Sequence, residues 1–441
     1  MLSCFRGVRA ARTGCPSFGD KSMPRDEALE RFDQLRIREV GSMDGLTASA
    51  FLAEFRSIAA SLEPDERIKL VVFMHESGVE LMKDVLADPL ANKICSLHWE
   101  YGGWEDVNPV IPLLVNSCPE LASLRADFWH YSAIDFASTM LEHPSNKLKE
   151  LEMTGYAQGD FARFFGALGQ SQVSAINIRG DSPPKFAQGL CKYLARDLLA
   201  RLNLRMGFRK MPSAMMVLLA KCTRLTELKL NACDFSPPTT IIHLSKSITK
   251  LELNYCTFVD GVDWSFLADS NVRELDFDHA GEVNGTQLGN ALAVHLRTKG
   301  LDKLRLFDCD FVNETLAVVG VEIGRIKRLD LGFSNLDDAS VELLALALQS
   351  PDGELRELML WHNWSAASIK DHLLPALKHP NCNLVKLSLS NFEGQTEAAG
   401  DAFRNRLALF VLLQGQQMKK RYCPLRRLPG DLFRLVGMVL I

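Results

Sequence analysis

The sequence has few of the features that assign a function directly. No apolar run approaches the ~20 residues of a membrane-spanning helix. In this chain of 441 residues, 50 basic and 54 acidic side chains leave a net charge of −4, which favours neither nucleic acid nor an anionic membrane as the main partner. The 11 cysteines form no C-x-x-C pair, so zinc ribbons and dithiol redox sites are excluded. No Pro-, Gly- or Ser-rich linker follows residue 90, which indicates one long structure.

Common catalytic motifs are also missing. The chain contains no G-x-S-x-G, no H-E-x-x-H, no paired acidic metal motif and no G-x-x-x-x-G-K-[ST] phosphate loop. Histidines such as His75, His98, His279 and His362 are isolated in the sequence, and we expect them to be surface or packed residues. The sequence therefore predicts no enzyme, with no catalytic residue, no cofactor and no metal site.

What the sequence does contain is a repeat. Residues 225–235 fit L-x-x-L-x-L-x-x-C-x-F, and the same spacing recurs from Ile248 and from Leu301 with every position filled. Weaker copies bring the number to twelve, starting at residues 94, 121, 148, 173, 199, 225, 248, 272, 301, 326, 355 and 384. The mean step, about 26 residues, is typical of solenoid repeats.

The spacing has a direct physical meaning. Leucines two apart, such as Leu228 and Leu230, point to the same side of a strand. One short strand cannot bury such a row alone, whereas a stack of parallel strands, each returning through an outer helix, buries it in a continuous core. Segments 287–297 and 338–349 show the helical spacing that such return segments need. Each unit is therefore predicted to be strand, turn and helix.

The chain resembles the leucine-rich repeat proteins of the ribonuclease-inhibitor-like, cysteine-containing subfamily. The best match is 373–389, in which Leu377, Cys382, Leu384 and Leu387 fit the end of a helix, a loop and a strand. The resemblance implies an α/β horseshoe that binds other proteins on its concave parallel sheet, and few such proteins are enzymes. It predicts residues 94–392 as about twelve repeats, preceded by a polar-faced helical cap.

The rest of the chain is divided accordingly. Residues 1–20 are predicted to be a disordered leader or a targeting segment, and 21–93 the helical N-terminal cap, with helical spacing at Phe51 and Phe55. Residues 393–441 are predicted to form C-terminal helices that serve as a cap or a docking tail. Arginines without acidic residues before Asp20 would also suit a mitochondrial transit peptide, so we expect a cytoplasmic protein with a mitochondrial location as the alternative.

Cys233, Cys256 and Cys309 occupy one position of the repeat, and Asn363 fills it in another. This position lies where the chain leaves the strand and its backbone groups lose their partners, so a small buried side chain that takes part in hydrogen bonds suits it. A metal or redox cluster is the alternative, but no histidine joins these cysteines. We interpret them as structural.

The alternation also predicts which side chains line the open face. Toward its C-terminal end this face gains large apolar groups and arginine, the residue types enriched at binding hot spots. The predicted partner-binding residues are Lys303, Arg305, Phe307, Arg328, Asp330, Glu357, Met359 and Trp361. Two alternatives stay open: opposite charges on neighbouring strands neutralise each other across the sheet, and Trp361 packs with Trp364 under the following loop.

The C-terminus contains an apolar stripe with arginines opposite. Its sequence resembles the first helix of an F-box, which implies docking onto a cullin-type ubiquitin ligase. The predicted docking tail comprises Leu428, Pro429, Leu432, Leu435 and Val436. The main prediction is a non-catalytic scaffold for a protein partner, without nucleic acid or integral membrane. The alternative is a substrate receptor that recruits the ligase core through this tail.

Overall fold

The computed structural model describes residues 34–388. The segments outside the description within this range are 41–44, 63–66, 75–77, 102–106, 108, 129–132, 156–158, 181–183, 207–211, 236–243, 259–261, 362, 364–368 and 378. Among the described helices, none combines the length and apolar character needed to cross a bilayer. The predicted leader and the predicted docking tail lie outside the described residues.

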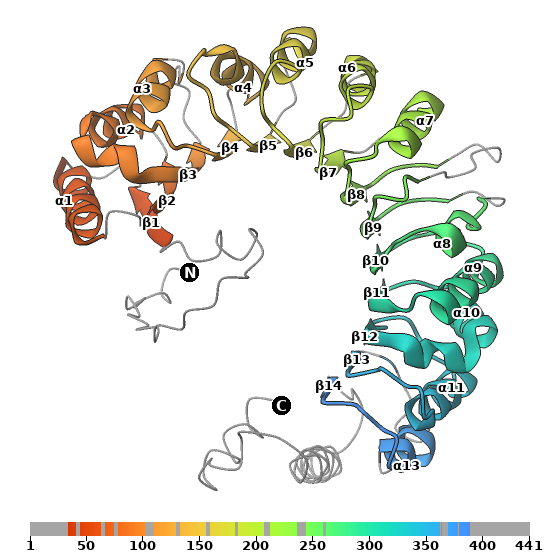
Figure 1. Ribbon diagram of the computed structural model, residues 1–441. Helices are drawn as coiled ribbons and strands as arrows, with labels where there is room; N and C mark the ends of the chain where they lie inside the picture. Colours follow the sequence, from red (N-terminus) through yellow and green to blue (C-terminus); the bar gives the residue numbers. More distant parts are fainter. Residues whose placement is uncertain are drawn as a thin grey trace, which may run out of the picture.

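Among the described residues, fourteen parallel strands form one sheet in which each strand pairs with the next along the chain. The sheet lines the inside of an arc, and the helices lie on its outer side (Figure 1). The strands are β1 (Gln34–Val40), β2 (Ile68–Met74), β3 (Ile94–Tyr101), β4 (Ser123–Phe128), β5 (Glu150–Gly155), β6 (Ala175–Gly180), β7 (Arg201–Met206), β8 (Glu227–Asn231), β9 (Lys250–Asn254), β10 (Glu274–Asp278), β11 (Leu301–Phe307), β12 (Ile326–Asp330), β13 (Glu357–Met359) and β14 (Lys386–Ser388).

Most connections between strands contain a helix. The α-helices are α1 (Gly45–Ser61), α2 (Gly78–Ala87), α3 (Val110–Ser117), α4 (Ala133–Glu142), α5 (Phe161–Leu168), α6 (Pro184–Leu194), α7 (Ser213–Lys221), α8 (Phe266–Asp269), α9 (Gly285–Thr298), α10 (Val312–Val319), α11 (Asp338–Gln349) and α13 (Leu374–Leu377). Shorter turns of helix are η2 (Pro89–Lys93), η3 (Gly320–Arg325) and η4 (Ile369–Leu373). The two predicted return helices, 287–297 and 338–349, correspond to α9 and α11 and are confirmed.

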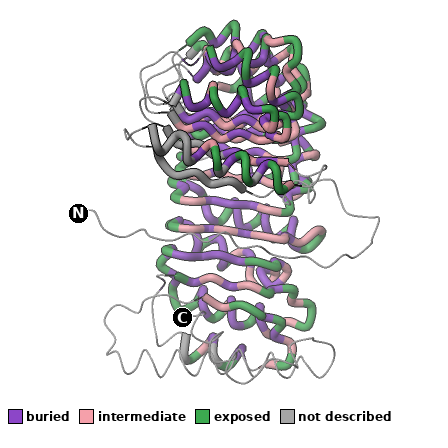
Figure 2. Tube along the Cα trace, turned by 90° about the vertical axis from the view of Figure 1, so that its left-hand side faces the viewer, coloured by how far each residue is buried: buried purple, intermediate pink, exposed green. Residues whose placement is uncertain are grey.

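The core lies between the sheet and the helices. Along β8 and β9, buried and half-buried residues alternate strictly, with Leu228, Leu230, Leu251 and Leu253 on the buried side. Figure 2 shows the same alternation along the stacked strands. Because each strand adds one pair of apolar residues to the same layer, the core continues through the repeats.

All twelve predicted repeat strands are present as β3 to β14, and the predicted α/β solenoid with a parallel concave sheet is confirmed. One prediction about the N-terminal region is wrong. Residues 21–93 were expected to be a helical cap, but they contain β1 and β2, which extend the same parallel sheet ahead of β3. The apolar and β-branched run Ile68–Met74 is a strand signal that lacks the leucine spacing of the later repeats.

Candidate functional site

The concave face consists of the side chains that alternate with the buried leucines. The predicted site residues lie on three adjacent strands: Lys303, Arg305 and Phe307 on β11, Arg328 and Asp330 on β12, and Glu357 and Met359 on β13, with Trp361 just beyond. Register places Arg305 opposite both Asp276 of β10 and Asp330 of β12. Asp330 is almost fully buried, whereas Trp361 is 40% exposed.

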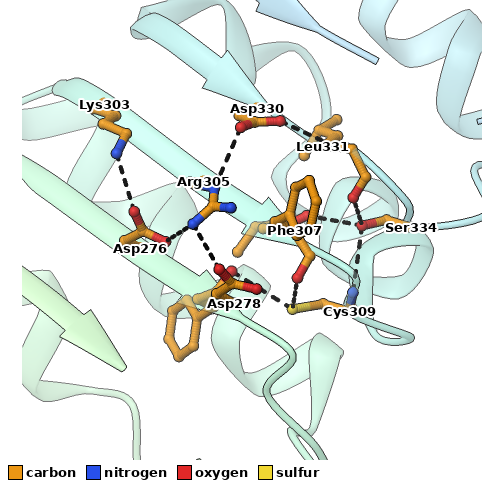
Figure 3. A network of polar contacts seen from close by, with 12 residues as sticks. Asp276, Asp278, Lys303, Arg305, Phe307, Cys309, Asp330, Leu331 and Ser334 are labelled. Atoms are coloured by element: carbon orange, nitrogen blue, oxygen red, sulfur yellow. Dashed lines mark hydrogen bonds and ion pairs between the residues drawn. The ribbon is translucent and has the colours of Figure 1, made fainter. Parts of the chain in front are cut away.

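Arg305 is the centre of an ion-pair cluster (Figure 3). Its Nη1 lies 2.8 Å from Asp278 Oδ2 and 3.4 Å from Asp276 Oδ1, and its Nε lies 3.3 Å from Asp330 Oδ2. Lys303 Nζ contacts the other oxygen of Asp276 at 3.0 Å. The guanidinium also lies over the Phe307 ring, 4.5 Å from its centroid. Arg305 is therefore engaged within the protein, as the prediction of charge neutralisation across the sheet requires.

Burial determines how these charges behave. The carboxylate of Asp276 is 8% exposed, and burial raises its pKa against the opposing effect of Lys303 and Arg305. Burial also lowers the pKa of Arg305, but the charges of Asp276 and Asp278 outweigh it and hold that pKa above its ordinary value. The cluster is thus a mutually dependent group, in which Asp276, Asp278 and Asp330 share the charge of Arg305.

A second network crosses β8, β9, β10 and β12. Glu252 forms ion pairs with Lys229 at 2.8 Å and with Lys250 at 3.2 Å. Glu274 forms ion pairs with Lys250 at 3.5 Å and with Arg328 at 3.3 Å. Arg328 is 44% exposed at its side chain. The charges predicted on this part of the face are therefore largely paired, and they leave the aromatic groups as the distinctive exposed feature.

One group of three potential metal ligands, His98, Glu100 and Asp127, comes together among the described residues, with ligand atoms within 4.8 Å of one another. Asp127 Oδ2 already contacts His98 Nε2 at 3.0 Å and Arg125 Nε at 2.9 Å. The guanidinium supplies the positive charge that a metal ion would otherwise bring and repels a second cation. We interpret the group as an ion-paired part of the concave face.

Asp127 provides a test of this interpretation. Burial raises its pKa, but the hydrogen bond with His98 and the charge of Arg125 outweigh burial and hold the pKa at about 2, against 3.8 ordinarily. We expect Asp127→Asn to lower the free energy of unfolding at pH 7 by about 2 kcal/mol. A depressed carboxyl pKa stabilises the fold above the unfolded-state value, so this difference should disappear as pH falls from about 4 to about 2. Denaturant titrations at several pH values measure it.

The control is Glu80→Gln, which changes a carboxylate that is 74% exposed and paired with Lys83. Its effect should stay within about 0.5 kcal/mol at every pH. An Asp127→Asn deficit that persists unchanged at pH 3 would contradict the charge-based account.

A row of aromatic side chains follows the carboxyl ends of β9 to β13. This aromatic row consists of Tyr255, His279, Phe307, Phe333 and Trp361. Tyr255 and His279 stack at 4.6 Å between ring centroids with planes 14° apart, His279 and Phe307 lie 6.1 Å apart, and Phe307 and Phe333 lie 5.0 Å apart. The backbone N–H of Phe333 donates to the carbonyl of Trp361 at 2.7 Å. Tyr255 is 53% exposed and Phe333 39%.

The alternation predicted Phe307 and Trp361 but missed Tyr255, His279 and Phe333. The signal was present, because each of these residues lies four positions after the second apolar position of its repeat, which is filled by Leu251, Leu275 and Leu329. The alternation did not predict them because each lies beyond the end of its strand, one residue after β9 and β10 and three residues after β12, where an in-and-out pattern no longer applies.

The repeat cysteines behave as structural residues. Cys233, Cys256 and Cys309 are buried free thiols, and Cys309 Sγ lies 3.3 Å from the carbonyl oxygen of Phe307. Burial raises the pKa of Cys309 to about 12, so this thiol is not a nucleophile at neutral pH.

The inward-facing apolar residues of successive strands share one register and one buried layer, as Leu228, Leu251 and Leu275 do across β8, β9 and β10. The strands, turns and outer helices together have the fold of a leucine-rich repeat solenoid. NACHT, LRR and PYD domains-containing protein 9 of Bos taurus aligns over 206 residues at 26% identity, covering 37% of this chain. The chain thus matches about a fifth (20%) of that relative's length. No family model matches the sequence.

Three solved structures are similar to this chain. An internalin from Listeria monocytogenes has 12% identity and a TM-score of 0.40, covering 77% of this chain and 95% of its own. The yeast complex of Rad7 and Elc1 has 14% identity and a TM-score of 0.39, with coverages of 74% and 85%. A complex of TLR13 with ssRNA13 has 12% identity and a TM-score of 0.37, with coverages of 76% and 59%. Similarity at this level supports no inference about function.

Proposed function

We propose that this leucine-rich repeat protein is a non-catalytic scaffold that binds a protein partner on the concave face of its sheet. The observation that supports it best is the exposed aromatic row on a face whose charges are otherwise paired internally. Fourteen strands spaced at about 4.8 Å give an arc of roughly 60 Å, a surface on the scale of a folded protein. Aromatic groups held in place by a rigid sheet lose little entropy on binding and are frequent hot spots.

Site-specific photo-cross-linking in cells tests this proposal. A photoreactive residue at Met359 on the concave face should give a discrete adduct with a partner protein, whereas the same residue at Leu346, which is 45% exposed on α11, should give none. Adducts from the helical side alone, or from neither position, would overturn the proposal.

The docking tail supports a second candidate, a substrate receptor of a cullin-type ubiquitin ligase. It rests on the sequence pattern at Leu428, Pro429 and Leu432, which lies outside the described residues. Deleting residues 425–441 should abolish co-purification with the ligase core while the cross-link at Met359 remains. Unchanged co-purification would exclude this role. The cytoplasmic location, and the mitochondrial alternative, stay predictions of the sequence.

A further inference from the structure

The loops next to the aromatic row have one sign of charge. After β8, β9, β10, β11 and β12 the chain runs through 232–235, 255–258, 279–284, 308–311 and 331–337, and these segments contain no lysine or arginine. With the last residue of β10 included, their carboxylates are Asp234, Asp278, Glu282, Asp308, Asp310 and Asp337. Asp308 and Asp310 are exposed. We call these loops together with the aromatic row the acidic aromatic edge.

The backbone directs these side chains outward. Tyr255, His279, Asp308 and Phe333 all have φ between 51° and 61°, a left-handed conformation that is uncommon for residues other than glycine and costs about 1 kcal/mol or more. Their N–H groups donate across to the next repeat, for example from Tyr255 to the carbonyl of Asp278 at 2.6 Å. The turn thus holds Tyr255 and Phe333 in a backbone conformation that glycine or asparagine would adopt at a lower free-energy cost. It places their rings at the edge of the sheet.

The edge has the composition that recognises a guanidinium group. Arg305 already lies over Phe307 and pairs with Asp278, so one arginine of the chain itself uses an aromatic face and a carboxylate together. Further out, His279 contacts Asp278 at 2.5 Å and Asp308 at 2.7 Å, which fixes its ring between Tyr255 and Phe307. The exposed rings of Tyr255 and Phe333 and the exposed carboxylates of Asp308 and Asp310, on loops that follow neighbouring strands, offer the same combination to a partner.

Spacing favours a helix as the partner element. Neighbouring strands lie about 4.8 Å apart, so four steps from β9 to β13 extend about 19 Å. A helix advances about 5.4 Å per turn, close to one strand spacing, whereas side chains on one side of an extended chain repeat every ~6.6 Å. The spacing of cations on a helix with one cation per turn on one side thus nearly matches the spacing of the strands that carry the aromatic row.

We propose that the acidic aromatic edge binds a helix of a partner protein that presents arginines along one side. The inference rests on the proposed function, since it assigns the class of partner to one part of the concave face. The arginines stack on the rings of Tyr255 and Phe333 and pair with carboxylates such as Asp308, and the aliphatic parts of their side chains cover Trp361.

Three alanine-based helical peptides of 16 residues serve as probes for the full-length protein, with fluorescence anisotropy as the readout. The first has arginines at positions 2, 6, 9 and 13, on one side; the second has lysines there; the third has the four arginines distributed around the helix. We expect the first to bind about tenfold more tightly than the third and several-fold more tightly than the second, since a planar guanidinium stacks better than an ammonium group.

Variants of the protein identify the surface. The double variant Tyr255→Ala with Phe333→Ala should weaken binding of the first peptide about tenfold and remove its preference over the lysine peptide. Asp308→Asn with Asp310→Asn should weaken all three peptides. The matched control is Leu346→Ala, an exposed apolar truncation on α11, which should change nothing. Thermal unfolding of each variant shows whether the fold is retained.

Four results would overturn the inference. Equal affinity for the three peptides, or an unchanged affinity of the Tyr255/Phe333 double variant, would show that the peptides bind only through non-specific charge attraction. Tighter peptide binding, by about tenfold, after deletion of the basic segment 419–441 would assign the edge to the chain's own tail. If no peptide binds while the Met359 cross-link still captures a partner, the result contradicts this inference alone. Absence of that cross-link would contradict the proposed function.

Discussion

Replacing Arg305 by methionine is expected to lower the free energy of unfolding by about 3–5 kcal/mol at pH 7. The substitution keeps much of the side-chain volume but leaves Asp276, Asp278 and Asp330, each less than a fifth exposed, without their shared cation. Chemical denaturation of the two proteins measures the loss.

The pH dependence separates this charge effect from a packing effect. Burial already raises the pKa of Asp276, and loss of Arg305 raises it further. A carboxyl with a raised pKa in the folded state favours folding once protonated, so the deficit of Arg305→Met should shrink as pH falls from 7 toward 5. The control is Arg328→Met, whose exposed pair with Glu274 should contribute no more than about 1 kcal/mol. Equal losses for both variants at every pH would contradict the central role of Arg305.

Because Arg305 stabilises the fold, its substitution is a poor test of partner binding. Arg305 was predicted from the sequence to contact a partner, but a variant that loses several kcal/mol of stability loses binding for that reason alone. Tyr255 and Phe333 are better probes of the face, because they are exposed and neutralise no buried charge.

Asn363→Ala is expected to cost about 3 kcal/mol of unfolding free energy. The side chain is 4% exposed. Its Oδ1 accepts from the N–H of Ser334 at 3.0 Å and of Leu336 at 3.3 Å, and its Nδ2 donates to the carbonyl of Leu331. Truncation leaves two buried N–H groups and a carbonyl without this partner, at about 1–3 kcal/mol for each unsatisfied group, and the costs add incompletely.

Amide hydrogen exchange gives this prediction a local readout. The N–H groups of Ser334 and Leu336 should exchange much faster in Asn363→Ala, while those of β6 keep their rates. Asn383→Ala is the control, since Asn383 is exposed and its Nδ2 donates to the carbonyl of Gly353 at 2.8 Å; a loss below about 1 kcal/mol is expected. Similar losses for the two variants would show that Asn363 does not organise the turn after β12.

The position shared by Cys309 and Asn363 shows what a local sequence pattern predicts and what it does not. Cys309 and Asn363 occupy equivalent places, and the sequence correctly predicted both as buried residues at the end of a strand. It did not show that Asn363 bonds to three backbone groups of the preceding repeat, since those partners lie about 30 residues away in the chain and become neighbours only when the strands stack. The additional strands β1 and β2 were missed for the opposite reason, because their local pattern departs from the leucine spacing.

The sequence by itself determined the leucine-rich repeat architecture, the twelve strands β3 to β14 and the set of side chains that face inward or outward, because a two-residue alternation and a period near 26 residues are local properties of the chain. Only the tertiary structure decided which outward residues are engaged by ion pairs and which are exposed. Register sets Arg305 between three aspartates and so makes it structural, whereas the left-handed turns set Tyr255, His279 and Phe333 in one row with Phe307 and Trp361. Contacts between repeats depend on how the strands align, and alignment across a sheet is a property of the folded stack.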